Sequence, residues 1–184
     1  MSVELQLPAG TGMQRHGHVL TLSGYWDEEL LDELQHGLLD LRQALPRAAG
    51  RKFVTLHLFN FSIAASAVNG ALSLVRRAFV DLHTDVSVVA EGALTGAGPL
   101  FLAGSQQGQR KVFADTRIEL RFSRRMGLTE LHASNSIVET ASMGAIPQPI
   151  PAEVHGQLLR NGVWSASPAE LIAVGWADKR IDRV

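Results

Sequence analysis

Hydrophobic and polar residues follow two alternating periodicities along most of this chain. Strands are indicated where apolar residues recur at every second position or run together between turn residues. The predicted strands are His18–Ser23, Phe53–Phe59, Asp85–Ala90, Lys111–Phe113 and Arg117–Arg121. Helical patterns lie between the first four of these strands. This alternation predicts an α/β fold with a mainly parallel sheet and crossover helices.

Helices are predicted where leucine, valine or alanine recurs at helical spacing. The clearest begins at a capping residue, Asp27, and ends before Pro46. The full set of predicted helices is Asp27–Leu45, Ser66–His83, Leu100–Gly104, Leu128–Met143, Ala152–Arg160 and Pro168–Val174. Residues 1–17 contain one proline and several glycines, so we expect an irregular arm there, followed by a single domain over 18–184.

Composition narrows the functional classes. The 184 residues suit one domain, and the absence of cysteine excludes disulfides, thiolate catalysis and cysteine-based metal sites. A net charge of −1 gives no strong attraction to nucleic acid or to an anionic membrane. No apolar run is long enough for a transmembrane helix, and no signal peptide is indicated. We expect a cytoplasmic protein with no cofactor and with neither nucleic acid nor membrane as a partner.

The stretch Glu91–Pro99 is the most informative part of the chain. It predicts the end of a strand and a tight turn of small residues, after which a buried helix begins. Several α/β hydrolases hold a nucleophile or an oxyanion-binding amide in that geometry. Gly96 occupies the tip of the predicted turn and has no side chain. The sequence therefore predicts a catalytic scaffold that lacks its reactive atom.

Several stretches occur in the order and spacing of one known family. The quoted segments are Leu58-Phe59-Asn60, Gly92-Ala93-Leu94-Thr95-Gly96-Ala97-Gly98, Leu102–Arg110, Ser165–Glu170 and Val174–Asp178. Together they resemble the proteolytic subunit of the Clp serine proteases, within the wider Clp/crotonase superfamily. The resemblance implies repeated β-α-β units, a mainly parallel sheet and a helical C-terminal part.

The same resemblance assigns the catalytic positions to residues that lack the required chemistry. The family's nucleophilic serine falls on Gly96 and its catalytic histidine on Arg121, which stays protonated and is no general base. The family's aspartate falls near Val163, in a segment without any acidic residue. Its oxyanion-hole glycines fall on Ile63 and Ala64, whose side chains restrict an amide flip. Four simultaneous losses indicate that peptide hydrolysis has been lost.

Weaker candidates for chemistry remain. Thr95 is a nucleophile only in a shifted register, and Ser142 lies in a short segment, Ala141–Ala145, that resembles the family's nucleophile motif by composition. His57 lies on a predicted strand within reach of the site. His16 and His18 form a pair with metal-ligand chemistry, although no further ligand is evident.

Anion binding is a second open question. The Ile63, Ala64 and Ala97 amides and the Arg121 side chain are the candidate oxyanion- or anion-binding groups. Arg117, Glu119 and Arg121 share one face of a strand, so an ion pair is one interpretation. The alternative is that Arg121, Arg124 and Arg125 bind phosphate or carboxylate.

The resemblance implies a structural or regulatory subunit without catalysis, in a homo-oligomer or a mixed ring with a Clp-like partner, and a peptide as ligand. Prolines at 147, 149 and 151, where the family has a long helix, argue against stacking of two rings. One alternative is a crotonase-like acyl-thioester enzyme or binder that uses the Gly92–Gly98 amides with Glu91 or Glu119 as acid. Another is a peptidase with rearranged catalytic residues.

Overall fold

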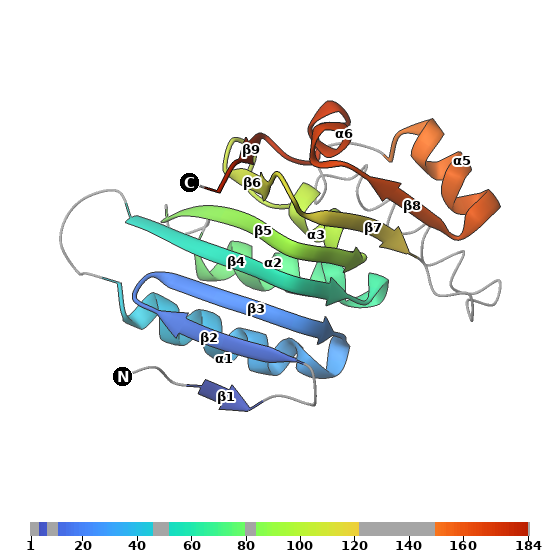
Figure 1. The fold of residues 1–184 in the computed structure, drawn as a ribbon. Coiled ribbons are helices and arrows are strands. Elements are labelled where there is room, and N and C mark those ends of the chain that lie inside the picture. The colour runs from blue at the N-terminus through green and yellow to red at the C-terminus, as the bar shows by residue number, and fades with distance from the viewer. Residues whose placement is uncertain (1–3, 7–10, 46–51, 80–83, 122–149, 184) are drawn as a thin grey trace.

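Three parallel strands form the centre of the sheet. They are β3 (Val19–Trp26), β4 (Lys52–Ile63) and β5 (Thr84–Gly96). The structure, a computed structural model, describes residues 4–6, 11–45, 52–79, 84–121 and 150–183. Figure 1 shows that these three strands end at the same side of the molecule, where β7 also ends.

Shorter strands extend the sheet on both sides, in the order β1-β2-β3-β4-β5-β6-β9, while β7 pairs with β5 and β8 pairs with β7. Their bounds are β1 Glu4–Gln6, β2 Gly12–His16, β6 Arg110–Phe113, β7 Arg117–Arg121, β8 Val163–Ala166 and β9 Lys179–Ile181. Pairing is antiparallel within β1-β2-β3 and between β7 and β8, and parallel elsewhere. The predicted α/β fold with a mainly parallel sheet is confirmed.

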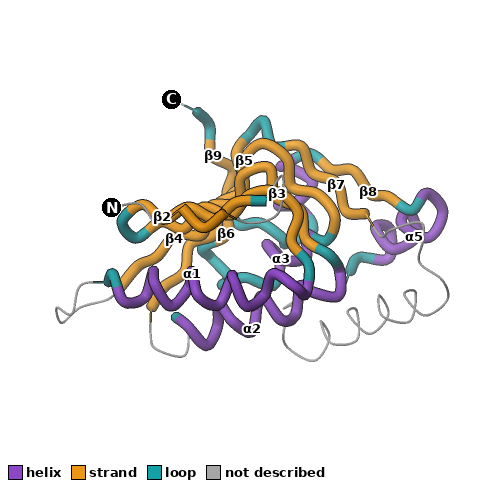
Figure 2. The backbone as a smooth tube through the Cα atoms, turned by 90° about the horizontal axis from the view of Figure 1, so that it is seen from below, coloured by secondary structure: helices purple, strands orange, loops and turns teal. Residues whose placement is uncertain are grey.

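Helices α1, α2 and α3 pack against one face of the sheet (Figure 2). The helices and 3-10 turns are η1 Glu28–Leu30, α1 Leu31–Gln43, η2 Ala65–Ala67, α2 Val68–Ala78, α3 Gly98–Ala103, α5 Ala152–Asn161 and α6 Pro168–Ala173. Asp27 caps η1 as predicted, since its carboxylate accepts from the Glu29 amide at 3.1 Å. The sequence prediction merged each 3-10 turn with the helix that follows it.

The core lies between these helices and the central strands. Leu34, Leu38 and Leu41 of α1 are buried. Along the middle of β4 and β5 every second residue is buried, among them Leu56 and Val88. Each leucine removed from water in this way contributes about 2 kcal/mol. The other face of the central strands is more exposed. On it, Phe59 keeps 40% and Phe53 keeps 56% of its surface accessible to solvent.

One sequence prediction about short elements is wrong, and two short strands were missed. Residues 4–6 and 12–16 form β1 and β2, so this part of the expected irregular arm adds a hairpin-linked edge to the sheet. Strands β8 and β9 were not predicted, because segments of four and three residues carry too little periodicity. The predicted helix Leu128–Met143 lies outside the described residues.

The predicted turn in the segment 92–98 is shorter than expected, because β5 continues to Gly96 and only Ala97 separates it from α3. A register shift between Phe59 and Phe61 lets both strands continue, with Asn60 at φ 46° and Gly92 at φ 75°. The Asn60 side chain accepts a hydrogen bond from the Ala93 amide at 3.0 Å. A Cβ on Gly92 would lie 2.4 Å from that same amide oxygen, so glycine is required beside Asn60.

Candidate functional site

The junction between β5 and α3 forms the expected elbow. The strand ends at Gly96, Ala97 is the cap, and the helix begins at Gly98 with Pro99 in its first turn. Gly96 has φ 60°, a left-handed conformation that L side chains rarely adopt. Sharp strand-to-helix turns of this kind present the nucleophile in α/β hydrolases. The elbow is present here, and the residue at its turn carries no side chain.

The space around Gly96 leaves no room for a side chain. A Cβ built on this residue would lie 2.7 Å from Oγ of Ser62 and 2.8 Å from the carbonyl oxygen of Ile63. The Ser62 hydroxyl is able to rotate away, whereas the Ile63 carbonyl belongs to the paired backbone of β4. A serine at position 96 therefore requires movement of the sheet itself.

Two of the candidate oxyanion-binding amides are already engaged. The Ala97 amide donates to the Ile63 carbonyl at 2.8 Å, and the Ala64 amide donates to the Trp26 carbonyl at 2.8 Å. An oxyanion hole needs N–H groups that point at the developing charge. In this conformation the predicted roles of Ala64 and Ala97 are blocked. Ile63 itself lies inside the sheet, in register with Trp26 and Gly96.

The three positions matched to the catalytic triad lie at the same end of the sheet. Gly96 ends β5, Arg121 ends β7, and Val163 begins β8 directly opposite Arg121. Figure 1 shows the ends of β5 and β7 on the same side of the molecule. The spatial grouping expected of a triad is therefore kept, while these three residues offer neither a hydroxyl nor a neutral base nor a carboxylate.

Arg121 takes part in a compact ionic cluster with Arg117 and Glu119. One carboxylate oxygen of Glu119 accepts from both Nε and Nη2 of Arg117, with the Nε contact at 2.9 Å. The other accepts from Nε of Arg121 at 2.7 Å and contacts its Nη2 at 2.6 Å. Hydrogen bonding from Arg117, and then from Arg121, lowers the pKa of the Glu119 carboxyl although burial opposes this. The predicted ion pair is confirmed, and it involves both arginines.

Among the residues that the structure describes, no base is paired with Thr95. On one side Thr95 lies opposite Ser62 of β4. On the other side β5 pairs with β7, and since Leu94 pairs with Ile118, the next residue, Thr95, lies beside Glu119. A carboxylate whose pKa is lowered by two arginines is a weak proton acceptor. Ser142, Arg124 and Arg125 lie outside the described residues.

His57 belongs to a different cluster, on the exposed face of the sheet. Its Nε2 lies 2.9 Å from Glu91, which also accepts from Arg183 at 2.8 Å. His57 is six residues before Ile63 on β4, a separation of roughly 20 Å along a strand. The expectation that His57 lies within reach of the elbow is wrong.

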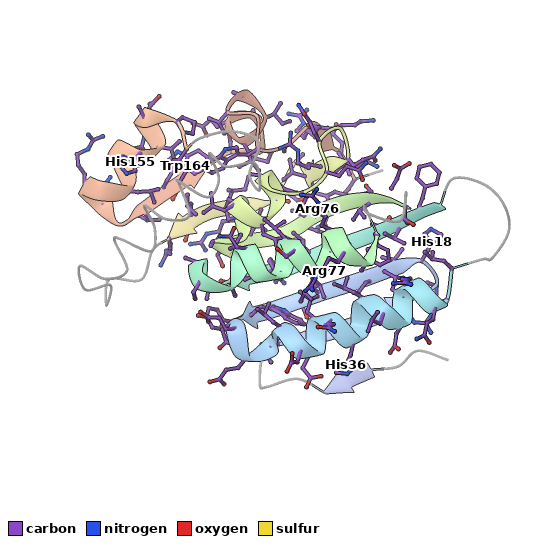
Figure 3. All side chains as sticks on the ribbon, turned by 180° about the vertical axis from the view of Figure 1, so that it is seen from behind. His18, His36, Arg76, Arg77, His155 and Trp164 are labelled. Atoms are coloured by element: carbon purple, nitrogen blue, oxygen red, sulfur yellow. The ribbon has the colours of Figure 1, made fainter. Side chains whose placement is uncertain are left out.

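The histidine pair His16 and His18 flanks the turn of the β2–β3 hairpin, where Gly17 has φ 59°. Figure 3 shows His18 far from His36 and His155, which lie in separate parts of the molecule. Among the described residues there is no group of three or more histidine, aspartate or glutamate side chains arranged to hold a metal ion.

Sequence reasoning missed three groups that shape these sites. The Ser62 hydroxyl and the Ile63 carbonyl fill the elbow, and Arg183 holds Glu91. The only sequence signal for the first two was the glycine at position 96, which implies a crowded or left-handed backbone. Arg183 gave no signal, because its partner is 92 residues away in the sequence.

The order of the strands, the helices on one face and the elbow after β5 define a Clp-protease-like fold. The crystal structure of the ClpP protease catalytic domain from Plasmodium falciparum is similar to this chain, with a TM-score of 0.60 and 15% sequence identity. The similarity covers 90% of this chain and 86% of that one. No protein-family model matches the sequence, and no curated protein sequence matches it either. The likeness establishes the fold.

Within the described part of the chain, every helix is too short or too polar to cross a membrane.

Proposed function

We propose that this chain is a Clp-protease-like protein without serine peptidase activity, which acts as a structural or regulatory subunit of an oligomer. The observation that carries the proposal is the state of the elbow. Gly96 has no nucleophile, the Ile63 carbonyl oxygen lies too close to admit a Cβ without movement, and the Ala97 amide donates to that carbonyl. A fold can be kept while the chemistry of its site is lost.

The two alternatives receive less support. In a crotonase-like enzyme Glu91 or Glu119 would act as the acid, yet Glu91 contacts His57 and Arg183, and Glu119 contacts two arginines. In a rearranged peptidase Thr95 would need a general base, yet its neighbour in register is a carboxylate with a lowered pKa.

Self-association or a mixed ring with a Clp-like partner belongs to the same proposal, as do a peptide ligand and a cytoplasmic location. The exposed aromatic side chains of Tyr25 and Phe53, which keep 54% and 56% of their surface accessible, are the residues that we propose contact another chain. Their burial would then stabilise the assembly.

The proposal is tested by covalent labelling. The purified full chain is incubated with a fluorophosphonate probe, beside an active Clp serine protease as positive control, and both are analysed by intact-protein mass. We expect the control to gain the mass of the probe and this chain to remain unchanged. Stoichiometric labelling that maps to Thr95 or Ser142, and that disappears in Thr95→Ala or Ser142→Ala, would overturn the proposal.

A further inference from the structure

The cluster of Arg117, Glu119 and Arg121 carries more positive charge than its internal pairing uses. Two guanidinium groups face one carboxylate, which leaves a net charge of +1. The arginine side chains keep 69% and 58% of their surface exposed, whereas that of Glu119 keeps 11%. An approaching anion therefore meets the two guanidinium groups before it meets the carboxylate.

Within the described part of the chain, each guanidinium group also has unused donors in a defined direction. Arg117 and Arg121 both contact Glu119 through the edge formed by Nε and Nη2. A guanidinium carries five N–H donors, so the edge formed by Nη1 and Nη2 stays available for a second pair of acceptor atoms. Because one buried carboxylate holds both side chains, little rotamer freedom remains to be lost when an anion binds.

Hydroxyl groups border the same cluster on both sides. Ser165 of β8 lies directly opposite Glu119, and Thr95 of β5 is the next residue in register on the other side. These positions lie at the carboxyl end of parallel strands β5 and β7, where ligands bind in many open α/β sheets. The elbow at Gly96 begins one residue beyond Thr95.

We propose that Arg117 and Arg121, oriented by Glu119 and bordered by Thr95 and Ser165, form a binding site for a doubly charged oxyanion of the phosphate class. A carboxylate ligand offers two oxygens, which are enough to accept from the edge of only one guanidinium group. A phosphate monoester group offers three terminal oxygens and about two charges at neutral pH, which suits two open edges and bordering hydroxyls. This site is independent of peptide hydrolysis and goes beyond the proposed subunit role.

The test uses inorganic phosphate as the probe. The full chain, labelled with ¹⁵N, is titrated with phosphate at low ionic strength and pH 7.5, and the arginine Nε–H signals are followed by NMR. We expect saturable shifts of the Arg117 and Arg121 signals. Arg117→Gln and Arg121→Gln should each weaken phosphate binding by about tenfold or more, the scale of one lost charge-assisted contact.

Arg180→Gln is the matched control, because Arg180 is 55% exposed and also pairs with a neighbouring carboxylate, that of Asp182. This variant should bind phosphate like the wild type. Arg117→Lys, which keeps the charge but loses the two-donor edge, should bind with intermediate affinity, and circular dichroism should show that all variants are folded. Absence of saturable shifts in the wild type, or equal weakening in Arg180→Gln, would show that the cluster is an ion pair without a ligand.

Discussion

Position 96 is restricted to glycine by its backbone conformation and by the atoms around it. Its φ of 60° disfavours any other residue, and the Ile63 carbonyl oxygen lies 2.8 Å from the position of a Cβ. The absence of a nucleophile is therefore built into the packing of β4 against β5. We expect that a serine introduced at this position would not create a hydrolase, since the Ala97 amide donates to the same carbonyl.

Replacing Gly96 by alanine should destabilise the protein more than the same change at Gly17. Both residues have nearly the same φ, 60° and 59°, but a Cβ on Gly17 would have no atom within 4 Å. Gly17→Ala should cost about 1 kcal/mol for the left-handed backbone. Gly96→Ala should cost roughly 1–3 kcal/mol more for the steric clash. Urea unfolding curves measure both, and equal losses would contradict the crowding at the elbow.

At the scale of elements, the long strands were predicted in part. The alternation in Phe53–Phe59 and Asp85–Ala90 identified β4 and β5, but both continue for several residues beyond the predicted end. The cause is the bulge at Asn60 and Gly92, which changes the phase of buried residues in β4 from Leu58 to Phe61. A window that assumes strict alternation stops where the phase changes.

The C-terminal elements are joined to the sheet by an ion pair that is largely buried. Arg110 of β6, with a side chain 4% exposed, contacts Asp178 through Nη2 at 2.6 Å and through Nε and its amide at 2.9 Å. Burial alone would raise the pKa of the Asp178 carboxyl, but the bonds from Arg110 outweigh it and lower that pKa. This contact holds the segment before β9 against β6.

Asp178→Asn should lower the free energy of unfolding at pH 7 by about 3 kcal/mol, because it leaves the Arg110 charge without its partner. A lowered folded-state pKa means that this stabilisation is present above the unfolded value of about 3.9 and is lost as pH falls through the folded value. The difference between wild type and variant in urea unfolding should therefore shrink below about pH 4.

Asp182→Asn is the control for that experiment. Asp182 and Arg180 are 3.5 Å apart, and both are more than half exposed. Such surface pairs contribute roughly 0–1 kcal/mol, so this variant should unfold almost like the wild type at every pH. An effect as large as that of Asp178→Asn would mean that burial does not set the strength of the Arg110 contact.

For the whole molecule, the fold class followed from the sequence, whereas the packing around Gly96 did not. Alternating periodicities predicted the parallel sheet, and the short motifs predicted the Clp-like fold that the structure comparison supports. The crowding at the elbow depends on the approach of Gly96 to Ser62 and Ile63, which lie more than thirty positions before it in the sequence. A local sequence pattern cannot predict such contacts, because they depend on how β4 pairs with β5.

Assembly is the property of the whole molecule that the proposed subunit role requires. We expect light scattering coupled to gel filtration to give either a mass of two or more chains of 19.9 kDa for the protein alone, or a joint complex heavier than either protein when it is mixed with a Clp-like partner. Phe53→Ser and Tyr25→Ser, which remove exposed aromatic side chains, should shift the distribution toward the monomer if these surfaces form contacts. A monomer under both conditions would contradict the subunit role and leave the account of the elbow intact.

The central claim is that the elbow at Gly96 no longer supports peptide hydrolysis. Its most direct test is the hydrolysis of fluorogenic peptides by the wild-type chain, with an active Clp protease as reference and Thr95→Ala as a matched variant. We predict that the wild type and Thr95→Ala both release fluorophore at the rate of buffer alone. Hydrolysis above that rate by the wild type, abolished in Thr95→Ala, would contradict the claim.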